Sequence, residues 1–352
     1  MALPFLNGFN RKTDEIVLVD LGVKLTKAVH ISRRGGGYSL HSYTIQETPL
    51  FEKGLNVEDV AEHLKKVIQS MESKCRFVGL AIGVGDSLLR HADMPAVPVH
   101  DMRTMLRYSS KNYLQQDLSD CVFDCHMLPF RAKEGDEGKP GSKARVLVGA
   151  AKKALVDDLA AAAKKAGYVP LQVVPGFIGP PNAFELARPE EFAQESVALV
   201  EIGHKNTTIT VLYEGELALS RVVSFGSERL TIGLADAMGI SEEEAEGAKI
   251  TMPPEVEAYL VALLSPLGRE LRASIDFFDH QHDKSVSRAF FSGGAACNAK
   301  IVEALQTEMM VPCETWNPTS FLATKLPPQQ IGEVEQIAPQ LGVAIGAAIS
   351  VF

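Results

Sequence analysis

The chain has 352 residues, of which 46% are hydrophobic and 22% charged, and its formal net charge at pH 7 is −9. These proportions are typical of a globular protein, and the length favours two lobes or domains over a single core. The acidic balance argues against nucleic-acid binding, which normally needs a basic face. We therefore expect no nucleic acid among the partners.

The first residues, MALPFLNGFNRKTD, lack the sustained apolar run and the cleavage pattern of a secretory signal. The longest apolar stretch, LGVAIGAAISVF at 341–352, is about half of the ~20 residues that a transmembrane helix needs. Five cysteines, an odd number without a CxxC pair, favour reduced thiols. These features predict a cytoplasmic protein without a span of its own, which reaches a membrane only through a partner.

Two clusters of potential metal ligands occur in the sequence. They are Cys121, Cys125 and His126, and His280, His282 and Asp283. The first cluster fits no common zinc spacing and alternates like a strand. The second closes a helical segment, where polar side chains are normally solvated. A structural interpretation is favoured for both.

The first seventy residues read as three strands and a helix. EIVLVDLG at 15–22 runs into a tight turn, and two alternating stretches follow, joined by GGGY at 35–38, whose glycines suit a hairpin. Apolar residues at 60, 64, 67, 68 and 71 then repeat with the helical period, which predicts a helix over about 58–71.

Residues 78 to about 175 predict an inserted subdomain. FVGLAIG and LLRHADMP read as strands, VHDMRTMLRYSSKNYL as a helix, and CVFDCHMLPF and ARVLVGAA as strands. RAKEGDEGKPGSK at 131–143 is a polar, glycine-rich loop for which we expect mobility. KKALVDDLAAAAKKAG reads as a helix ended by a glycine in the C-cap position.

After a segment rich in proline and glycine, the opening pattern starts again. SVALVEIG, TTITVLYEG and ELALSRVVSFG read as three strands joined by tight turns. Ser241 and Glu244 form a capping box at a helix start. The long helical pattern at 255–282 contains Pro266, which predicts a kink or a break. RAFFSGGAACNAKIVEALQTEM reads as strand, glycine turn and helix, and 337–352 as a helix of small residues.

The two halves share one short motif. VDLGVKLTK at 19–27 and VEIGHKNTT at 200–208 each place an acid at a strand end, a glycine two residues on and a threonine six residues on. Such a turn can point backbone N–H groups at an anion, and its glycine lets a phosphate approach. The acids, Asp20 and Glu201, suit a phosphate only when a cation such as Mg²⁺ lies between them.

Two such hairpins, one in each lobe, could clamp the phosphates of a nucleotide, with Lys27 neutralising charge. A third element, Ser292-Gly293-Gly294, follows a strand and precedes a helix, where backbone can meet a phosphate or adenosine. Each motif alone is more often an ordinary turn. The prediction of a nucleotide site rests on the order of all three motifs.

With these motifs in this order, the sequence resembles the PilM family of the actin-like ATPase superfamily, from Ile16 to Phe352. The segments that carry the resemblance are VDLGVKLTKAVHISRRGGGYSLHSY, LAIGVGDSLLRHADMP, ARVLVGAA with AGYVPLQVV, RVVSFGSERLTIGLADAMGISEEEAEGAK, and APQLGVAIGAAI. The resemblance implies an α/β fold: the actin-like (ribonuclease H-like) two-lobed ATPase fold with an inserted small α+β subdomain.

The resemblance also implies domain limits. They are 15–77 for the N-terminal part of the first lobe, 78–175 for the inserted subdomain with a partner groove, 196–330 for the second lobe with a helical subdomain at 231–286, and 331–352 for a C-terminal helix returning to the first lobe.

Site residues follow from the same resemblance. It implies that ATP contacts Asp20, Gly22, Lys24, Lys27, Gly203, Thr207, Glu246, Lys249, Gly293 and Gly294, and that Asp20 and Glu201 hold Mg²⁺, directly or through water. Glu246 and Lys249 fall on the family's AExxK motif, which borders the adenosine. From composition alone they are one more (i, i+3) surface ion pair.

The sequence departs from the family at both hairpins. Val23, Lys24 and Leu25 stand where the family has small hydroxyl residues, so hydroxyl donors are missing there. Glu201 replaces the usual aspartate, which moves the carboxylate one methylene outward, and Mg²⁺ tolerates little misplacement. No residue emerges as a base for the attacking water. We therefore expect ATP binding with weak or absent hydrolysis.

The resemblance implies a scaffold of type IV pilus assembly, peripheral to the inner membrane, that binds the N-terminal tail of a PilN-like membrane protein. Two alternatives stay open. One is a small-molecule kinase of the same superfamily, for which Glu47 and Glu52 are the acids that follow the first hairpin. The other is a degenerate scaffold without nucleotide. Self-association into a homo-oligomer, and a role in a related secretion system, also stay open.

Overall fold

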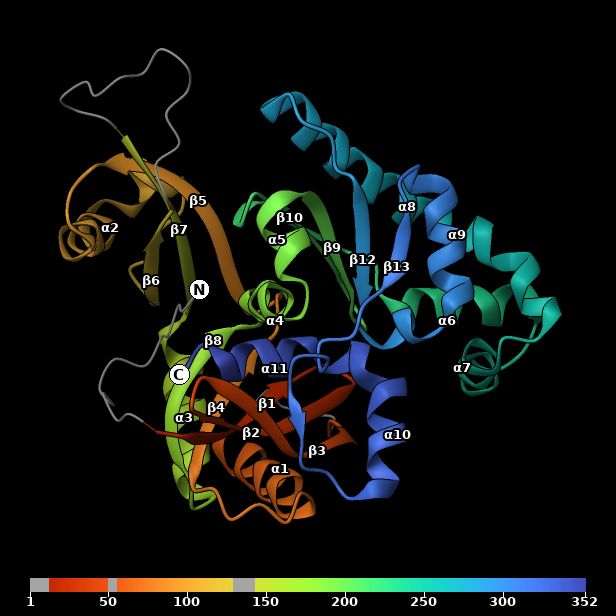
Figure 1. Cartoon of the computed structure of the whole chain (residues 1–352), viewed down its shortest axis with the longest axis horizontal. Coiled ribbons are helices and arrows are strands. Elements are labelled where there is room, and N and C mark those ends of the chain that lie inside the picture. The colour runs from red at the N-terminus through yellow and green to blue at the C-terminus, as the bar shows by residue number, and fades with distance from the viewer. Residues whose placement is uncertain (1–12, 50–55, 129–142) are drawn as a thin grey trace. The chain divides into compact units, whose positions relative to one another are not determined.

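The structure is a computed structural model that describes residues 13–49, 56–128 and 143–352 (Figure 1). The chain forms two compact units. The first comprises Met1–Gly36, His41–Gly179 and Ala347–Phe352, and the second comprises Gly37–Leu40 and Pro180–Gly346. Most of the loop expected at 131–143, nearly all of the leader, and Glu52 lie outside the described residues.

The main sheet of the first unit has the strand order β14-β3-β2-β1-β4-β8. Its strands are β1 (Glu15–Leu21), β2 (Leu25–Arg34), β3 (Gly37–Glu47), β4 (Phe77–Ile82), β8 (Val169–Pro175) and the short β14 (Ala323–Thr324). β14 pairs with Ser39 and Leu40, which belong to the second unit, as β14 does. β1 is antiparallel to β2 and parallel to β4, which is parallel to β8. The three opening strands are therefore confirmed.

Two helices, α1 (Val57–Ser70) and α3 (Lys153–Lys165), pack against each other and against this sheet (Figure 1). Val17 and Val19 of β1 share a buried core with Leu64 of α1 and Leu159 of α3. Alternate residues of a strand face the same side, so this core lies on one face of β1. The helix predicted at 58–71 is confirmed, as is the glycine at the end of α3, because Gly167 has a φ of +92°.

A separate three-stranded antiparallel sheet has the order β5-β7-β6. It consists of β5 (Ser87–Pro95), β6 (Cys121–Met127) and β7 (Lys143–Lys152), and α2 (Val99–Leu114) packs on it. Met94, Met102, Leu106 and Val146 are fully buried in its own hydrophobic core. β4 and β8, although all but Phe77 of these strands falls within 78–175, pair in the six-stranded sheet instead.

The sheet of the second unit has the order β11-β10-β9-β12-β13. Its strands are β9 (Ser196–Ile202), β10 (Thr207–Tyr213), β11 (Glu216–Val223), β12 (Arg288–Ser292) and β13 (Cys313–Thr315). β9 is antiparallel to β10 and parallel to β12, which is parallel to β13. This repeats the order β3-β2-β1-β4-β8 of the first unit. The two acidic motifs therefore occupy equivalent hairpins, β1–β2 and β9–β10.

Helices pack on both faces of the second sheet. The core on one face includes residues of α6 (Ser227–Met238), α7 (Glu242–Thr251), α8 (Pro254–His282) and α9 (Ala299–Met309). The other helices among the described residues are α4 (Gly179–Ala187), α5 (Pro189–Gln194), α10 (Pro328–Ile337) and α11 (Gly342–Ile349). Phe291 of β12 joins the core that contains α8. Its neighbour Phe290 points to the opposite face, 4.8 Å from the ring of Phe184, which contacts Trp316 at 5.3 Å.

Two local predictions for the second unit have different outcomes. The capping box at α7 is confirmed, because the Ser241 side chain accepts from the Glu244 backbone and Glu244 reaches back to the Ser241 N–H. The sequence predicts a kink or a break at Pro266, and the break is wrong, since α8 continues through the proline. Leu264, Leu267 and Leu271 of this helix are buried, and their packing stabilises α8 across the proline.

Candidate functional site

Asp20 lies near the end of β1, directly opposite Lys27 of β2. Its side chain is nearly buried, and Lys27 Nζ lies 3.2 Å from Asp20 Oδ2. A buried carboxylate is costly unless a charged or hydrogen-bonding partner compensates it, and Lys27 is that partner. The structure therefore brings together the predicted acid and the predicted cation of the first hairpin.

The turn after Asp20 requires glycine. A Cβ on Gly22 would lie 2.4 Å from the Leu25 carbonyl oxygen, closer than real Cβ contacts. The Gly22 N–H is not free, because it donates to the Asp20 carbonyl at 3.1 Å. Lys24, the other residue predicted here, accepts from the Thr48 N–H through its carbonyl at 2.9 Å. The turn is thus closed by its own backbone.

A buried polar network holds the turn after Asp20 in place. The Thr26 hydroxyl lies 2.7 Å from His63 Nε2 and 2.9 Å from the Thr48 hydroxyl. Thr48 in turn donates to the Gly22 carbonyl at 2.7 Å. Burial lowers the pKa of His63, and nearby Lys66 lowers it further, which favours a neutral imidazole. The motif's threonine therefore anchors the turn, and no sequence motif singles out His63 or Thr48.

Glu201, the acid of the second hairpin, has a different partner. It lies opposite Thr208 of β10 and beside Ser292 of β12. The fully buried Ser292 hydroxyl donates to Glu201 Oε2. Glu201 thus has a neutral hydroxyl where Asp20 has an ammonium group. The pairing depends on the parallel register of β9 and β12, which the sequence alone does not reveal.

The second turn is also closed tightly. A Cβ on Gly203 would lie 2.8 Å from the Asn206 carbonyl oxygen, and the Gly203 N–H donates to that oxygen at 3.0 Å. Thr207 is fully buried and donates its hydroxyl to the Phe225 carbonyl at 2.7 Å. This predicted ligand therefore anchors the hairpin, as Thr26 does in the first unit.

Gly293 lies against the end of β9. Its φ is +92°, and a Cβ there would lie 2.3 Å from the Ile202 carbonyl oxygen. Its N–H donates to the Pro339 carbonyl at 2.8 Å. Gly294 has more space, since a Cβ added there would have as its nearest neighbour a Gln340 side-chain atom at 3.7 Å. Carboxyl ends of neighbouring parallel strands are common ligand sites in α/β proteins, and the second unit gathers Glu201 and both glycines there.

Glu246 and Lys249 belong to a partly buried network between α7 and the start of α6. Lys249 Nζ donates to Glu246 Oε2 at 2.6 Å, to Thr231 Oγ1 at 2.7 Å and to the Ser227 carbonyl at 3.4 Å. Only 6% of the Lys249 side chain is exposed, so the alternative of an ordinary surface ion pair is wrong. Ser227 also donates its N–H to the Gly203 carbonyl at 2.9 Å, which connects this network to the second hairpin.

Neither sequence cluster of potential metal ligands forms a site. Within the described residues, no three ligand atoms of either cluster come close enough to share one metal ion. Burial is the main cause that raises the pKa of the Cys121 and Cys125 thiols to about 11, which suits structural side chains. Across the same residues, no helix is long and apolar enough to cross a bilayer.

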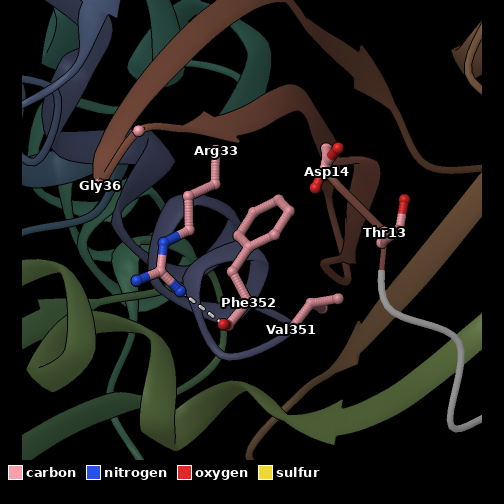
Figure 2. Close-up of a pocket in the computed structure, with 7 residues that line it drawn as sticks. Thr13, Asp14, Arg33, Gly36, Val351 and Phe352 are labelled. Carbon is pink, nitrogen blue, oxygen red and sulfur yellow. Dashed lines mark hydrogen bonds between the residues drawn. The ribbon is translucent and has the colours of Figure 1, made fainter.

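A pocket of about 430 Å³ lies elsewhere in the first unit (Figure 2). It is lined by Thr13, Asp14, Arg33, Gly35, Gly36, Val351 and Phe352. Arg33 Nη1 donates to the Phe352 carbonyl at 2.6 Å beside it. None of the predicted nucleotide residues lines this pocket, so we do not assign it to the nucleotide.

Two sheets of the same strand order, each with an acidic hairpin at the same place, define the actin-like ATPase fold, and comparison with solved structures agrees. The chain is similar to the ethanolamine utilization protein EutJ from Carboxydothermus hydrogenoformans (14% identity, 96% of this chain and 90% of that chain, TM-score 0.54). It is also similar to MreB 5 of Spiroplasma citri bound to AMPPNP (10% identity, 96% of each chain, TM-score 0.50).

A closer match is a chain of a PilM-PilN type IV pilus biogenesis complex, at 22% identity, 96% of this chain, 99% of that chain and a TM-score of 0.81. Residues 19–352 match the family described as type IV pilus assembly protein PilM. The chain belongs to this family.

Proposed function

We propose that this protein is a nucleotide-binding scaffold of type IV pilus assembly, which binds ATP with Mg²⁺ at its two hairpins. We propose further that it holds the N-terminal tail of a PilN-like protein at the cytoplasmic face of the inner membrane. The observation that carries the nucleotide proposal is the acidic hairpin repeated at equivalent positions of two equivalent sheets. Family membership supports the setting and the partner.

The residues present fit the nucleotide and its metal. Asp20 and Glu201 offer carboxylate oxygens, the ligands that Mg²⁺ prefers, and would hold it directly or through water. Bound Mg²⁺ would offset the negative charge of the phosphates. Lys27, already paired with Asp20, would neutralise part of the remaining charge. Gly22 and Gly203 let each turn close tightly on its own backbone, where we propose that phosphate approaches.

Other predicted residues suit supporting roles. Glu246 keeps 29% of its side chain exposed, so its carboxylate could accept a hydrogen bond from a ribose hydroxyl. Lys249 is buried beneath it and positions it. Thr207 donates to backbone, so we assign it to the shape of the hairpin. We propose that ATP is bound with weak or absent hydrolysis.

The kinase alternative has less support. It needs an acid or base positioned at an acceptor hydroxyl. Glu47 is an exposed residue at the end of β3. This exposed position gives the kinase alternative no support from Glu47, and Glu52 lies outside the described residues.

A binding titration tests the nucleotide proposal. Purified full-length protein is titrated with a fluorescent ATP analogue, with and without Mg²⁺, beside Asp20→Asn and a matched control, Asp124→Asn. Asp124 is as buried as Asp20, at 6%, and also pairs with a cation, Arg103, at 2.7 Å. We expect magnesium-dependent binding that Asp20→Asn weakens at least ~10-fold, which corresponds to about 1.4 kcal/mol, and that Asp124→Asn leaves unchanged.

Either of two results would remove the nucleotide from the proposal. One is no binding by the wild-type protein at millimolar analogue. The other is an equal loss in both variants, since that would report general destabilisation rather than a site.

A second experiment tests the location of the partner groove, which we place in the small sheet and its helix. Ser87 of β5 lies opposite Ala151 of β7, so the two ends of this segment are neighbours, roughly 5 Å apart. Residues 87–152 can therefore be replaced by a short glycine linker without cutting β4 or β8. We expect this variant to lose binding of a PilN-like tail peptide while it keeps nucleotide binding. Undiminished peptide binding would exclude this location.

A further inference from the structure

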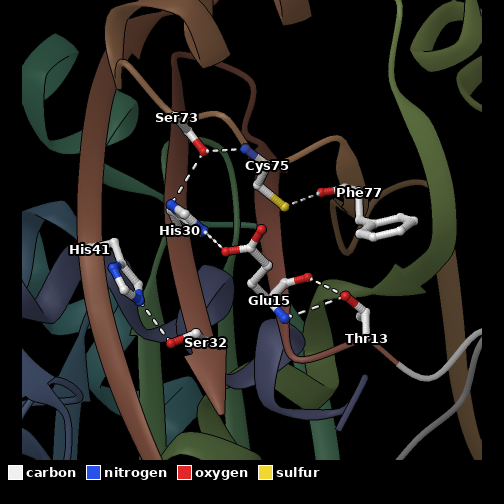
Figure 3. A network of polar contacts seen from close by, with 8 residues as sticks. All are labelled: Thr13, Glu15, His30, Ser32, His41, Ser73, Cys75 and Phe77. Atoms are coloured by element: carbon white, nitrogen blue, oxygen red, sulfur yellow. Dashed lines mark hydrogen bonds and ion pairs between the residues drawn. The ribbon is translucent and has the colours of Figure 1, made fainter. Parts of the chain in front are cut away.

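Three side chains with metal-binding atoms meet in the first unit, at the opposite end of the β1–β2 hairpin from its acidic turn (Figure 3). Glu15 begins β1, His30 lies in β2, and Cys75 precedes β4. One ligand atom from each lies within 4.8 Å of the other two. Glu15 Oε2 is 3.3 Å from His30 Nε2. Because the three positions are far apart in the sequence, no spacing motif predicts that they form a site.

We propose that Glu15, His30 and Cys75 bind a divalent cation of the zinc type. Thiolate, imidazole and carboxylate are the three kinds of side chain that coordinate Zn²⁺, and three protein ligands leave a fourth position for water. Mixed ligands of this kind do not suit Mg²⁺ or Ca²⁺, which prefer oxygen alone. This site is therefore distinct in chemistry from the magnesium site that we propose at the turns of the two hairpins.

The geometry needs only a small contraction to coordinate a metal. Tetrahedral zinc with the usual bond lengths places its ligand atoms roughly 3.3–3.8 Å apart, so the widest present separation must close by about 1 Å. The Glu15 side chain is 46% exposed and is free of core packing, so it can rotate toward the other two ligands. Cys75 and His30 are buried and held from two elements, so they form the fixed part of the site.

Surrounding hydrogen bonds orient the histidine and the cysteine. Ser73 Oγ lies 3.2 Å from His30 Nδ1 and accepts from the Cys75 N–H at 3.2 Å. Metal-binding histidines generally donate their other ring N–H to such a partner. When Nδ1–H donates to Ser73, the Nε2 lone pair faces the Glu15 carboxylate, and a cation between them makes this arrangement favourable. His41 stacks on the His30 ring at 4.8 Å, which restrains its plane.

Metal binding would link β1, β2 and the segment that precedes β4. Burial raises the pKa of the Cys75 thiol, so the free thiol keeps its proton. This proton passes to solvent when the sulfur–metal bond forms. Glu15 and Asp20 are five residues apart on β1, roughly 17 Å, so the two sites are separate. The proposal therefore stands independently of nucleotide binding.

Cobalt titration tests this proposal. Full-length protein without an affinity tag is stripped with a chelator and titrated with Co²⁺, then with Zn²⁺. We expect one Co²⁺ per chain, a near-ultraviolet charge-transfer band that reports thiolate coordination, and displacement by Zn²⁺. Cys75→Ser should abolish the band. The control Cys313→Ser should keep it, since Cys313 is a partly buried thiol outside the cluster, its pKa raised by burial to about 12.

Glu15→Gln decides the outcome even if Cys75→Ser fails to fold, because Glu15 is half exposed and its replacement leaves the core intact. We expect at least a ~10-fold loss of Co²⁺ affinity in Glu15→Gln, and a Zn²⁺-dependent rise in unfolding temperature that occurs in the wild type only. Absence of the thiolate band in the wild type, its persistence in Cys75→Ser, or unchanged affinity in Glu15→Gln would each overturn the proposal.

Discussion

Gly293 and Gly294 are adjacent, yet the structure predicts opposite responses to alanine. Gly293 has a φ of +92°, and an added Cβ would meet the Ile202 carbonyl oxygen at 2.3 Å and its carbon at 2.8 Å. These are backbone atoms of β9, which cannot rotate away. Gly294 lacks a positive φ, and a Cβ there would find only the flexible Gln340 side chain, at 3.7 Å.

The magnitude follows from two separate effects at Gly293. With φ +92° and ψ 169°, Gly293 occupies a backbone region essentially confined to glycine, where a residue with a Cβ costs roughly 1–3 kcal/mol. Forcing an atom into a packed space costs about 1–3 kcal/mol more. Gly293→Ala should therefore lower the free energy of unfolding by about 2–6 kcal/mol. Gly294→Ala should change it by less than ~1 kcal/mol, with a gain favoured because the unfolded chain loses entropy.

Tryptophan fluorescence during urea unfolding measures this difference. Trp316 is the chain's one tryptophan, it is buried, and its backbone N–H donates to the Phe291 carbonyl at 3.3 Å, two residues before Gly293. We expect the unfolding midpoint to fall for Gly293→Ala and to stay or rise for Gly294→Ala. Equal midpoints, or a larger loss at Gly294, would refute the argument from backbone approach.

Three further predictions concern other parts of the molecule. Lys249→Met removes the cation that pairs with Glu246 and should lower the free energy of unfolding by roughly 1–3 kcal/mol, less than for a fully buried pair because Glu246 is partly exposed. Adding Glu246→Gln should recover part of this loss. A double-mutant cycle that shows no coupling between the two residues would contradict the prediction. Burial lowers the pKa of His63, so the unfolded state binds the proton more readily, and stability should fall as the pH drops below 6.5. His63→Gln should flatten the dependence of stability on pH between about pH 7 and 5, whereas substitution of the exposed His280 by Gln should not. Identical stability profiles for His63→Gln and the wild type would rule out His63 as the cause. Pro266→Ala should stabilise α8 by roughly 1–2 kcal/mol, because it restores a backbone N–H to the helix at an exposed position. An unfolding temperature at or below that of the wild type would show that the helix accommodates the proline without cost.

Much of the local structure was predictable from the sequence, because it depends on residues only a few positions apart. The apolar spacing of α1, the glycines before β3, and the Ser241–Glu244 capping box all act within one turn of chain. The repeat of acid, glycine and threonine was visible for the same reason, since each hairpin closes on its own backbone.

Tertiary structure decided what depends on distant residues. Strand pairing placed β4 beside β1, and the register of β9 with β12 gave Glu201 its Ser292 partner. Packing carried α8 through Pro266 and buried Lys249, which composition alone would leave on the surface. Local sequence carries the turns and helices because their hydrogen bonds are short-range, whereas burial and strand register arise only when segments far apart in the chain pack together.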